Sequence, residues 1–533
     1  MSDEFKTNYL FNRFVSGKLS RREFVGRLAA MGASAALIDN LIVDRALAAT
    51  PKKGGKITVG TEGQQPGDSL DPTKFNSTSN LLMGFSVYDL LVNRGPDLKP
   101  IPWLAESWEA SADSKTWTFK LRKDVTWHDG KKFTAADVVY SCGRHITEKS
   151  ESPAKAYMSQ IAEMKKDGDH TVVFTLKAGN ADFPIILSDT RVHITQEGYE
   201  DFASGTAPGT GPFKVKEFKP GQRYIFERND NYWSSDGPYV DEIEVLGIGD
   251  ITSRVNALIS GDINVLLSLD PKAVSLIEKT GAANLLRAKS GQFMNIAMML
   301  DREPTNNNDL RLALKHAIDR EQIIENVLKG YGSVGNDHPV APIDPFYCDT
   351  IPQRAYDPEK ARFHIKKAGL ENTPIDLYTS DVPASGSVAA TQVFQQSAAK
   401  AGINLNLIEP PADQYWSSVW IKKPICASGW DGRPVPDLIL SIAFKSGESY
   451  NETKWANEKF DKILVEARSV QDFDKRKEMY CELQTMLQND GGHITMAFLD
   501  ILDASRPEVM GITPHSSGAL GFYQMARTVW IDS

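Results

Sequence analysis

The 533-residue sequence has little cysteine and no excess of basic residues. Its 4 cysteines stand far apart, with no Cys-x-x-Cys pair, so a cysteine-bound metal cluster is not expected. One disulfide would be compatible with an oxidising compartment, but the sequence leaves the pairing of Cys142, Cys348, Cys426 and Cys481 open. The formal net charge of −9 gives no general attraction to nucleic acid, and we expect no nucleic-acid partner.

Sequence signatures of enzymes are missing as well. The chain contains no His-Glu-x-x-His, no Gly-x-Ser-x-Gly and no Gly-x-x-x-x-Gly-Lys-Ser/Thr motif. The pair His128–Asp129 could suggest acid–base chemistry, but it lies in "WHDG", and Asp-Gly is typical of a turn between two strands. We therefore expect no catalytic residues, no bound metal and no cofactor. A secreted hydrolase with a convergent site remains the alternative.

A long membrane-spanning segment is also missing near the N-terminus. Gly26–Val43 is apolar but is interrupted by Asp39, and it falls short of the roughly 18 uninterrupted apolar residues that a spanning helix needs. It follows Ser20-Arg-Arg-Glu-Phe-Val25 and precedes Ala46-Leu-Ala48. This order resembles a twin-arginine signal, so residues 1–48 are predicted to be removed after Ala48, on export to the periplasm by the twin-arginine machinery. An amphipathic terminal helix is the alternative.

The rest of the chain alternates between strand and helix patterns. Its length exceeds one compact core, so two or three domains are expected. Thr134–Asp137 has the form of a capping box, and Leu310–Leu328 has the apolar periodicity of one amphipathic helix. Asp357-Pro358 predicts a helix start, with its end at Gly369. Two more helices are predicted within 452–487, broken near Gln471, so the fold class is mixed α/β.

A series of ordered motifs resembles one family, the peptide/nickel class of extracytoplasmic solute-binding proteins of ABC importers. Most specific is the succession "PWLAESWE", "TWTFKLR", "VTWHDG" and "FTAADV" between Pro102 and Val138. Further resemblance is spread over the chain after the signal, in the segments Gly209–Phe213, Gly237–Val245, Arg254–Asn264, Leu310–Ile324 and Tyr356–Gly369.

The resemblance implies a fold and a working cycle. The fold is of the type II periplasmic-binding-protein kind, with two lobes around a cleft and an inserted subdomain in the first lobe. The expected ranges are 49–88, 205–290 and 507–533 for the first lobe, 89–204 for the inserted subdomain and 291–506 for the second lobe. Ligand would be enclosed by hinge closure, and the closed form would dock on the permease subunits of an ABC importer in the inner membrane.

One short segment carries the strongest site prediction. In peptide-binding members of the family, an acid after a "GW" pair meets the amino terminus of the peptide. Here the segment reads "GWDGRPVPD", and Arg433 stands at or beside that position. Asp431 could supply the acid, or Arg433 could present its planar fork to a carboxylate, phosphate or sulfate. Alternatively, Arg433 pairs only with Asp431 or Asp437. Trp430, in the same segment, is predicted to form part of the cleft wall.

Other site candidates rest on weaker patterns. Each could instead be a core or structural residue: Gln65 and Asn80 in the first lobe, and Asn295, His338 and Trp416 in the second.

These patterns lead to one function. The sequence predicts a periplasmic, monomeric, non-enzymatic binding protein for a peptide or another small, anionic solute. A scavenger of metal or haem chelates on the same fold is the other alternative, and the sequence is silent on any role at a chemoreceptor.

Overall fold

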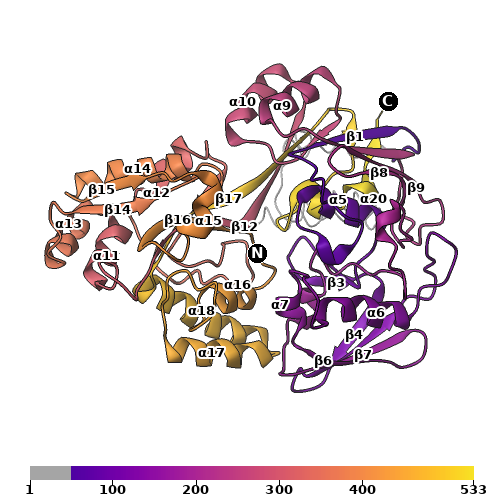
Figure 1. The fold of residues 1–533 in the computed structure, drawn as a ribbon, viewed down its shortest axis with the longest axis horizontal. Coiled ribbons are helices and arrows are strands. Elements are labelled where there is room, and N and C mark those ends of the chain that lie inside the picture. The colour runs from indigo at the N-terminus through magenta and orange to yellow at the C-terminus, as the bar shows by residue number, and fades with distance from the viewer. Residues whose placement is uncertain (1–49, 533) are drawn as a thin grey trace, which may run out of the picture.

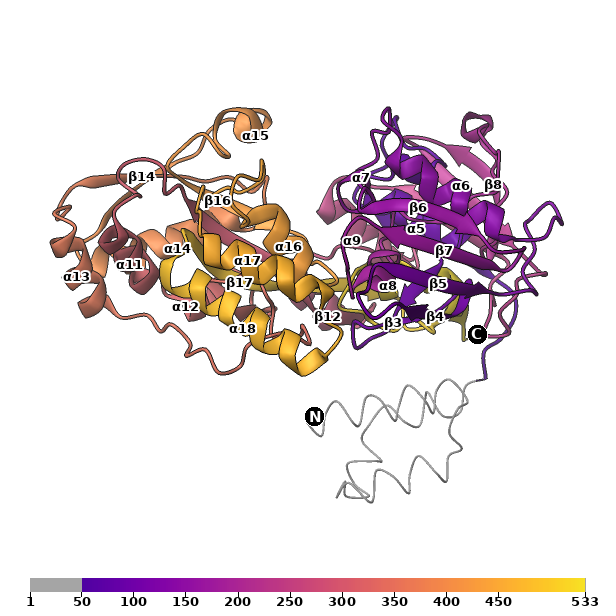
Figure 2. The same ribbon diagram turned by 90° about the horizontal axis from the view of Figure 1, so that it is seen from below.

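Two lobes lie side by side and are joined by two long strands (Figures 1 and 2). The computed structural model describes residues 50–532. The twin-arginine signal predicted for residues 1–48 therefore lies outside the described residues.

The first lobe is built on a mixed sheet at the right of Figure 1. Its central strand β1 (Lys56–Thr61) runs parallel to both of its neighbours, β10 (Glu242–Gly247) and β11 (Val265–Leu266). Antiparallel β9 (Arg223–Arg228) and β8 (Phe213–Lys219) complete this half. Alternate residues of β1 and β10 point into one apolar core, as the period of a strand requires. The longer helices of this lobe are α5 (Thr78–Val87), α9 (Ile251–Ser260) and α10 (Pro271–Thr280).

Two strands belong to both lobes. β12 (Asn284–Met298) and β17 (His493–Ser505) run antiparallel, and the first-lobe half of β17 pairs on its other side with β11. The other half of β12 pairs with β16 (Ile425–Trp430) in the second lobe. The β12–β17 register shifts between Lys289 and Phe293, where the strands pass from one lobe to the other. Because only this pair continues the sheet across the junction, it is the natural hinge (Figure 2).

The second lobe extends the sheet through β14 (Pro374–Tyr378) and β15 (Asn404–Ile408), with β13 (Gly332–Val334) on β17. Its helices are α11 (Asn308–Ala317), α12 (Arg320–Asn326), α13 (Pro358–Lys367), α14 (Ser387–Lys400), α15 (Tyr415–Ser418), α16 (Pro436–Ala443), α17 (Glu458–Ser469) and α18 (Phe473–Asp490). The break predicted near Gln471 is confirmed. The single helix predicted over 310–328 is wrong: Asp319 caps a new helix by accepting from Gln322 N, so the apolar pattern continues across two helices.

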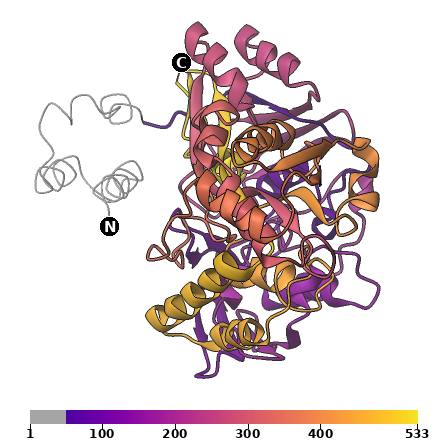
Figure 3. The ribbon, with the colours of Figure 1, turned by 90° about the vertical axis from the view of Figure 1, so that its left-hand side faces the viewer.

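The inserted subdomain has a separate four-stranded antiparallel sheet and its own apolar core. The strands are β4 (Ala105–Ala110), β5 (Thr116–Leu121), β7 (Thr171–Leu176) and β6 (Ile161–Lys166), in this spatial order. Helix α6 (Ala135–Ile146) begins with the predicted capping box of Thr134 and Asp137. The short elements are α7 (Lys155–Met158), α8 (Phe183–Ile186), β2 (Val92–Arg94) and β3 (Pro100–Pro102). In Figures 1 and 3 this subdomain lies at the same end of the molecule as α17 and α18.

The last part of the described chain returns to the first lobe. β18 (Val509–Met510), α19 (Ala519–Phe522), α20 (Met525–Thr528) and β19 (Trp530–Ile531) contribute to the first-lobe core. Short 3₁₀ turns stand at Pro72–Lys74, Phe202–Ser204 and Ala412–Gln414. Of the helices between residues 50 and 532, none combines the length and apolar character needed to cross a bilayer.

The cysteine pairing that the sequence left open is between Cys348 and Cys481, whose Cα atoms are 4.9 Å apart. It ties the segment after β13 to α18. Cys142 and Cys426 are buried free thiols. Burial raises the pKa of Cys142 to about 12, so this thiol is not a nucleophile at neutral pH.

Candidate functional site

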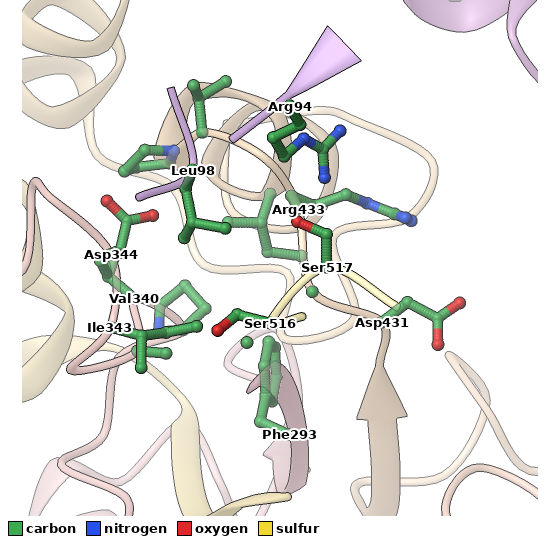
Figure 4. A pocket seen from close by; sticks show the side chains of 17 residues that line it. Arg94, Leu98, Phe293, Val340, Ile343, Asp344, Asp431, Arg433, Ser516 and Ser517 are labelled. Atoms are coloured by element: carbon green, nitrogen blue, oxygen red, sulfur yellow. The ribbon is translucent and has the colours of Figure 1, made fainter. Parts of the chain in front are cut away.

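A pocket opens between the two lobes (Figure 4). Its cavity volume is about 30 Å³, so in this arrangement of the lobes it has room for one or two water molecules. The subdomain and the C-terminal segment of the first lobe contribute Arg94, Leu98, Ser516 and Ser517. The linking strand and the second lobe contribute Gly291, Phe293, Pro339, Val340, Ala341, Ile343, Asp344, Asp431, Gly432, Arg433, Val435, Pro436 and Ile439. Apolar walls with a few charged groups are typical of a small-molecule site.

The loop that carries Arg433 is positioned by the sheet beneath it. Trp430, the last residue of β16, pairs with Phe293 of β12, so the loop begins directly over the hinge strands. A Cβ added at Gly432 would lie 3.0 Å from the carbonyl carbon of Gly291. Only glycine lets the two backbones approach this closely. The segment then enters α16, which leaves Arg433 between a strand end and a helix start at the pocket wall.

Arg433 has no hydrogen bond or ion pair within residues 50–532, and its side chain is half-buried. Asp431 is exposed and accepts from Gln292 Nε2 at 3.2 Å. Asp437 is buried and accepts from Arg468 Nε at 3.0 Å. Neither of the two acids that the sequence offered as partners is therefore paired with Arg433, and its guanidinium is left for another acceptor.

Asp344 is the acid on the other side of the pocket (Figure 4). Burial raises its pKa to about 7, although the Phe346 N–H donates to Oδ1 at 2.8 Å and favours the charged form. At neutral pH this carboxyl is therefore divided between its charged and neutral forms, and it can either accept or donate a hydrogen bond.

Trp430 is held by a buried acid that the sequence did not single out. Glu452 Oε1 accepts from Trp430 Nε1 at 3.2 Å and from Asn295 Nδ2 at 2.8 Å. Glu452 Oε2 accepts from Trp420 Nε1 at 2.7 Å and from Ser428 Oγ at 2.6 Å. The carboxylate is 1% exposed and is satisfied by neutral donors, so it fixes the indole rings next to the pocket loop.

The other predicted site residues lie outside the pocket lining. Trp416 is 47% exposed and contacts Trp420 edge-on at 5.5 Å between ring centroids. Asn295 is fully buried in the Glu452 network, and His338 is fully buried with neither ring nitrogen bonded. Two first-lobe residues differ in exposure: Gln65 is exposed in a loop, whereas the amide of Asn80 is buried without a partner. Of the eight candidates, the pocket brings together Asp431 and Arg433, and their ligand contacts stay predictions.

Arg94, Ser517 and Asp344 line the pocket and were not predicted. Arg94 ends the short strand β2 in "LLVNRG", and Ser517 lies in the loop "TPHSSG" near the other end of the chain. A loop of turn residues was the only available signal for Ser517, and nothing in the local sequence marks Arg94. A metal site is not suggested: residues 50–532 contain no group of three or more His, Cys, Asp or Glu placed to hold an ion.

Known proteins resemble this chain in sequence, and solved structures resemble it in fold. The dipeptide-binding protein of Escherichia coli K12 is 28% identical over 446 residues, which cover 77% of this chain and 83% of that protein. Heme-binding protein A of Haemophilus influenzae is 27% identical over 502 residues, covering 86% of this chain and 89% of that protein. The crystal structure of the ABC transporter substrate-binding protein CtaP of Listeria monocytogenes superimposes with a TM-score of 0.81 at 24% identity, covering 90% of this chain and 100% of that one.

The family model "Bacterial extracellular solute-binding proteins, family 5 Middle" matches residues 99–451. This range includes most of the inserted subdomain, the hinge strand β12 and the loop of Arg433. The two-lobed α/β fold expected from the sequence is confirmed, and the hydrolase alternative is not favoured. The chain belongs to the bacterial extracellular solute-binding proteins of family 5.

Proposed function

We propose that this protein captures a peptide or another small anionic solute between its lobes and delivers it to an ABC importer in the inner membrane. The observation that carries the proposal is the pocket itself, because both lobes line it and one wall presents the unpaired Arg433. A solute that contacts both walls stabilises the arrangement in which the lobes are together.

The hinge strands supply the motion that such capture needs. In β12, Ser290 interrupts the ladder: its Oγ donates to Leu499 O at 2.7 Å and accepts from Gln292 N at 3.0 Å. These bonds replace regular pairing where the register shifts, so a small change of backbone angles at 290–292 can rotate one lobe against the other.

The direct test is native mass spectrometry of protein purified from its own cells. The expected result is one small solute bound per chain, released on unfolding and carrying an acidic group. Small-angle scattering should give a smaller radius of gyration with the solute than without it. No bound solute, and no solute that changes the scattering curve, would refute the proposal. Incubation with the released solute should leave it chemically unchanged, whereas turnover would indicate a hydrolase.

Export by the twin-arginine machinery, cleavage after Ala48 and a monomeric periplasmic form are part of the proposal. Changing Arg21 and Arg22 together to Lys should leave precursor in the cytoplasm, and normal periplasmic accumulation of that variant would contradict this route. The residue ranges expected for the lobes are also proposed: the separate apolar core of the inserted subdomain supports 89–204 as a unit.

Peptide capture is the first candidate class, since the dipeptide-binding relative covers most of the chain. Because heme-binding protein A is also a relative, a haem or metal chelate is the other candidate class of solute. No cluster of metal ligands within the described residues supports it. Arg433, where peptide-binding members carry an acid, favours a solute whose acidic rather than ammonium group meets this loop.

A further inference from the structure

Arg94 is a buried cation without an acid partner. It is 7% exposed, and its Nε and Nη2 both donate to one oxygen, Ser188 Oγ, at 3.2 and 3.0 Å. The guanidinium carbon lies 4.8 Å from the ring centroid of Phe522. Within residues 50–532, no carboxylate lies within ion-pairing distance of Arg94. Desolvation lowers its pKa to about 10, where it is still charged at neutral pH.

Positive charge exceeds negative charge around Arg94. Asp189 is the acid whose field reaches it, but Asp189 is already bonded to Arg191, Oδ1 to Nη1, at 3.5 Å. Burial opposes ionisation of Asp189, yet the charge of Arg191 and, more weakly, that of Arg433 keep its pKa below the ordinary value. Three guanidinium groups therefore share one partly buried carboxylate. The neighbouring Asp431 is exposed and cannot neutralise this surplus as a buried acid would.

A hydroxyl stands beside these cations. Ser517 Oγ lines the pocket, is buried and has no hydrogen-bond partner. Its loop is held in place by His515, whose Nδ1 accepts from Ser517 N at 3.0 Å and whose Nε2 donates to Gly95 O at 3.0 Å. Burial lowers the pKa of His515 to about 4, so the ring is neutral and can make both bonds. The loop is thereby fixed to the residue that follows Arg94.

We propose that Arg94 and Ser517 of the first-lobe side and Arg433 of the second lobe form one subsite for a carboxylate or phosphate group of the solute. In Figure 4 the two arginine side chains extend in the same direction, away from Asp344. An anion held here is bound by both lobes, so it couples binding to closure. The inference rests on the proposed function, and it goes further in naming the chemical group and the residues that receive it.

The subsite also determines which solutes bind poorly. A neutral solute leaves the buried Arg94 and the half-buried Arg433 without an anion, and an ammonium group would meet charges of its own sign. A free amino group of the solute must therefore lie elsewhere, and Asp344, on the other side of the pocket, is the available acid.

The test uses four probes on the full mature chain: trialanine with a free carboxyl end, trialanine amide, succinate and inorganic phosphate. Binding is measured by calorimetry, at matched ionic strength in chloride. The variants are Arg433→Met, Arg94→Gln and their double mutant, with Arg433→Lys in addition. Arg362→Met is the control, because Arg362 is an exposed arginine of α13 away from the pocket.

At least one acidic probe should bind the wild type and Arg362→Met equally, and should lose about thirtyfold or more in affinity in either single pocket variant. Arg433→Lys should recover part of that loss, since an ammonium cannot make the planar two-point contact. Trialanine amide should bind weakly and be insensitive to these substitutions. Succinate and phosphate, compared with trialanine, show whether a second carboxylate, a phosphate or a peptide is preferred.

Several results would overturn the subsite. One is that no acidic probe binds better than the amide; another is equal affinity in wild type and the folded Arg433→Met variant. Because Arg94→Gln could disturb the core, its circular dichroism and melting curve are compared with those of wild type. If Arg94→Gln is unfolded, the affinity of Arg433→Met alone decides whether the subsite exists. If native mass spectrometry still finds one solute per chain while these tests fail, solute capture stands and only the anion subsite is wrong.

Discussion

Asp182 of the inserted subdomain and Arg476 of α18 form an ion pair of 2.8 Å across the boundary between the lobes. Both side chains are at most 10% exposed. Next to them, Ala181 N donates to Arg468 O at 2.8 Å, and Gln471 Nε2 donates to Ser111 O at 2.9 Å. The two lobes are therefore connected at two places: covalently through the hinge strands, and by these polar contacts at the end where α17 and α18 meet the subdomain (Figure 3).

We expect Arg476→Met to weaken this contact and open the lobes. Burial already raises the pKa of Asp182 to about 6, so without Arg476 its carboxyl would be buried and unpaired. Breaking a buried pair from one side costs about 3–5 kcal/mol. The solute-free variant should show a larger radius of gyration than wild type by small-angle scattering, and weaker binding of any solute that requires closure.

The control for Arg476→Met is Lys459→Met. Lys459 pairs with Glu482 at 2.6 Å on the same two helices, but both side chains are exposed and lie within one lobe. Exposed pairs contribute about 0–1 kcal/mol. The scattering curve of Lys459→Met should match that of wild type. If Arg476→Met also matched it, the contact between subdomain and α18 would have no influence on closure.

Lys315 should make the stability of the second lobe depend on pH. It is 1% exposed in α11, donates from Nζ to Gln488 O at 2.9 Å, and has its pKa lowered to about 7 by burial. Above pH 7 the folded state has released this proton, whereas the unfolded chain keeps it up to about pH 10.5. The unfolded state thus binds more protons in this window, so the free energy of unfolding rises with pH by about 1.4 kcal/mol per unit.

The measurement is urea denaturation at several pH values between 7 and 9. In Lys315→Met the free energy of unfolding should no longer rise with pH. In Lys400→Met, changed at an exposed position of α14, it should rise as in wild type. Equal slopes in Lys315→Met and wild type would mean that Lys315 stays charged in the folded lobe.

The fold was predictable where the signal is local. The capping box at Thr134, the start of α13 at Asp357-Pro358 and the end near Gly369, which has φ of 72°, each depend on a few neighbouring residues. The break between α11 and α12 was missed because apolar residues continue at helical spacing on both sides of Asp319, and only the cap geometry ends the first helix.

The site was predictable in part for the same reason. Arg433 lies in a short motif, so its place at the pocket could be inferred from the residues around it. Arg94 depends on Phe522 and Ser188, which are far from it in sequence, and its lack of an acid partner is a property of the packed structure. Glu452 was missed similarly, since its four donors come from three separate segments.

The Cys348–Cys481 disulfide should stabilise one wall of the pocket. It closes a loop with a sequence separation of 133 residues, for which the chain-entropy model gives about 5 kcal/mol and experience with native disulfides about 2–5 kcal/mol. Gln484 of α18 holds the same segment: its Oε1 accepts from Cys348 N at 3.1 Å and its Nε2 donates to Phe346 O at 2.9 Å. Replacing both Cys348 and Cys481 by Ala should lower the free energy of unfolding by about 2–5 kcal/mol.

Chemical reduction of the disulfide is an independent test of the same stabilisation. Dithiothreitol should lower the melting temperature of wild type and of Cys142→Ala, in which a free buried thiol is removed, but not that of the double Ala variant. A double variant as stable as oxidised wild type would show that the cross-link constrains nothing in the unfolded chain.

Glu452 should orient the aromatic residues next to the pocket loop, and Glu452→Gln is the sharpest test of this role. The change keeps the shape of the side chain but replaces one acceptor oxygen by an NH₂ group, which donates. Each carboxylate oxygen now accepts from one indole: Oε1 from Trp430 and Oε2 from Trp420. Whichever way the amide is turned, one indole N–H faces another donor. No cation compensates, because burial lowers the pKa of the nearby His493 to about 3 and leaves it neutral.

We expect Glu452→Gln to lower the free energy of unfolding by about 2–4 kcal/mol, the scale for losing charge-assisted bonds and leaving one buried donor unsatisfied. Tryptophan emission should shift to longer wavelength as an indole becomes mobile, and solute affinity should fall because Trp430 directly precedes Asp431–Arg433. Glu466→Gln, at an exposed position of α17, should change neither stability nor emission. If Glu452→Gln matched wild type in stability and emission, the rings would be held by their mutual packing, with centroids 5.5–6.5 Å apart, and not by the carboxylate.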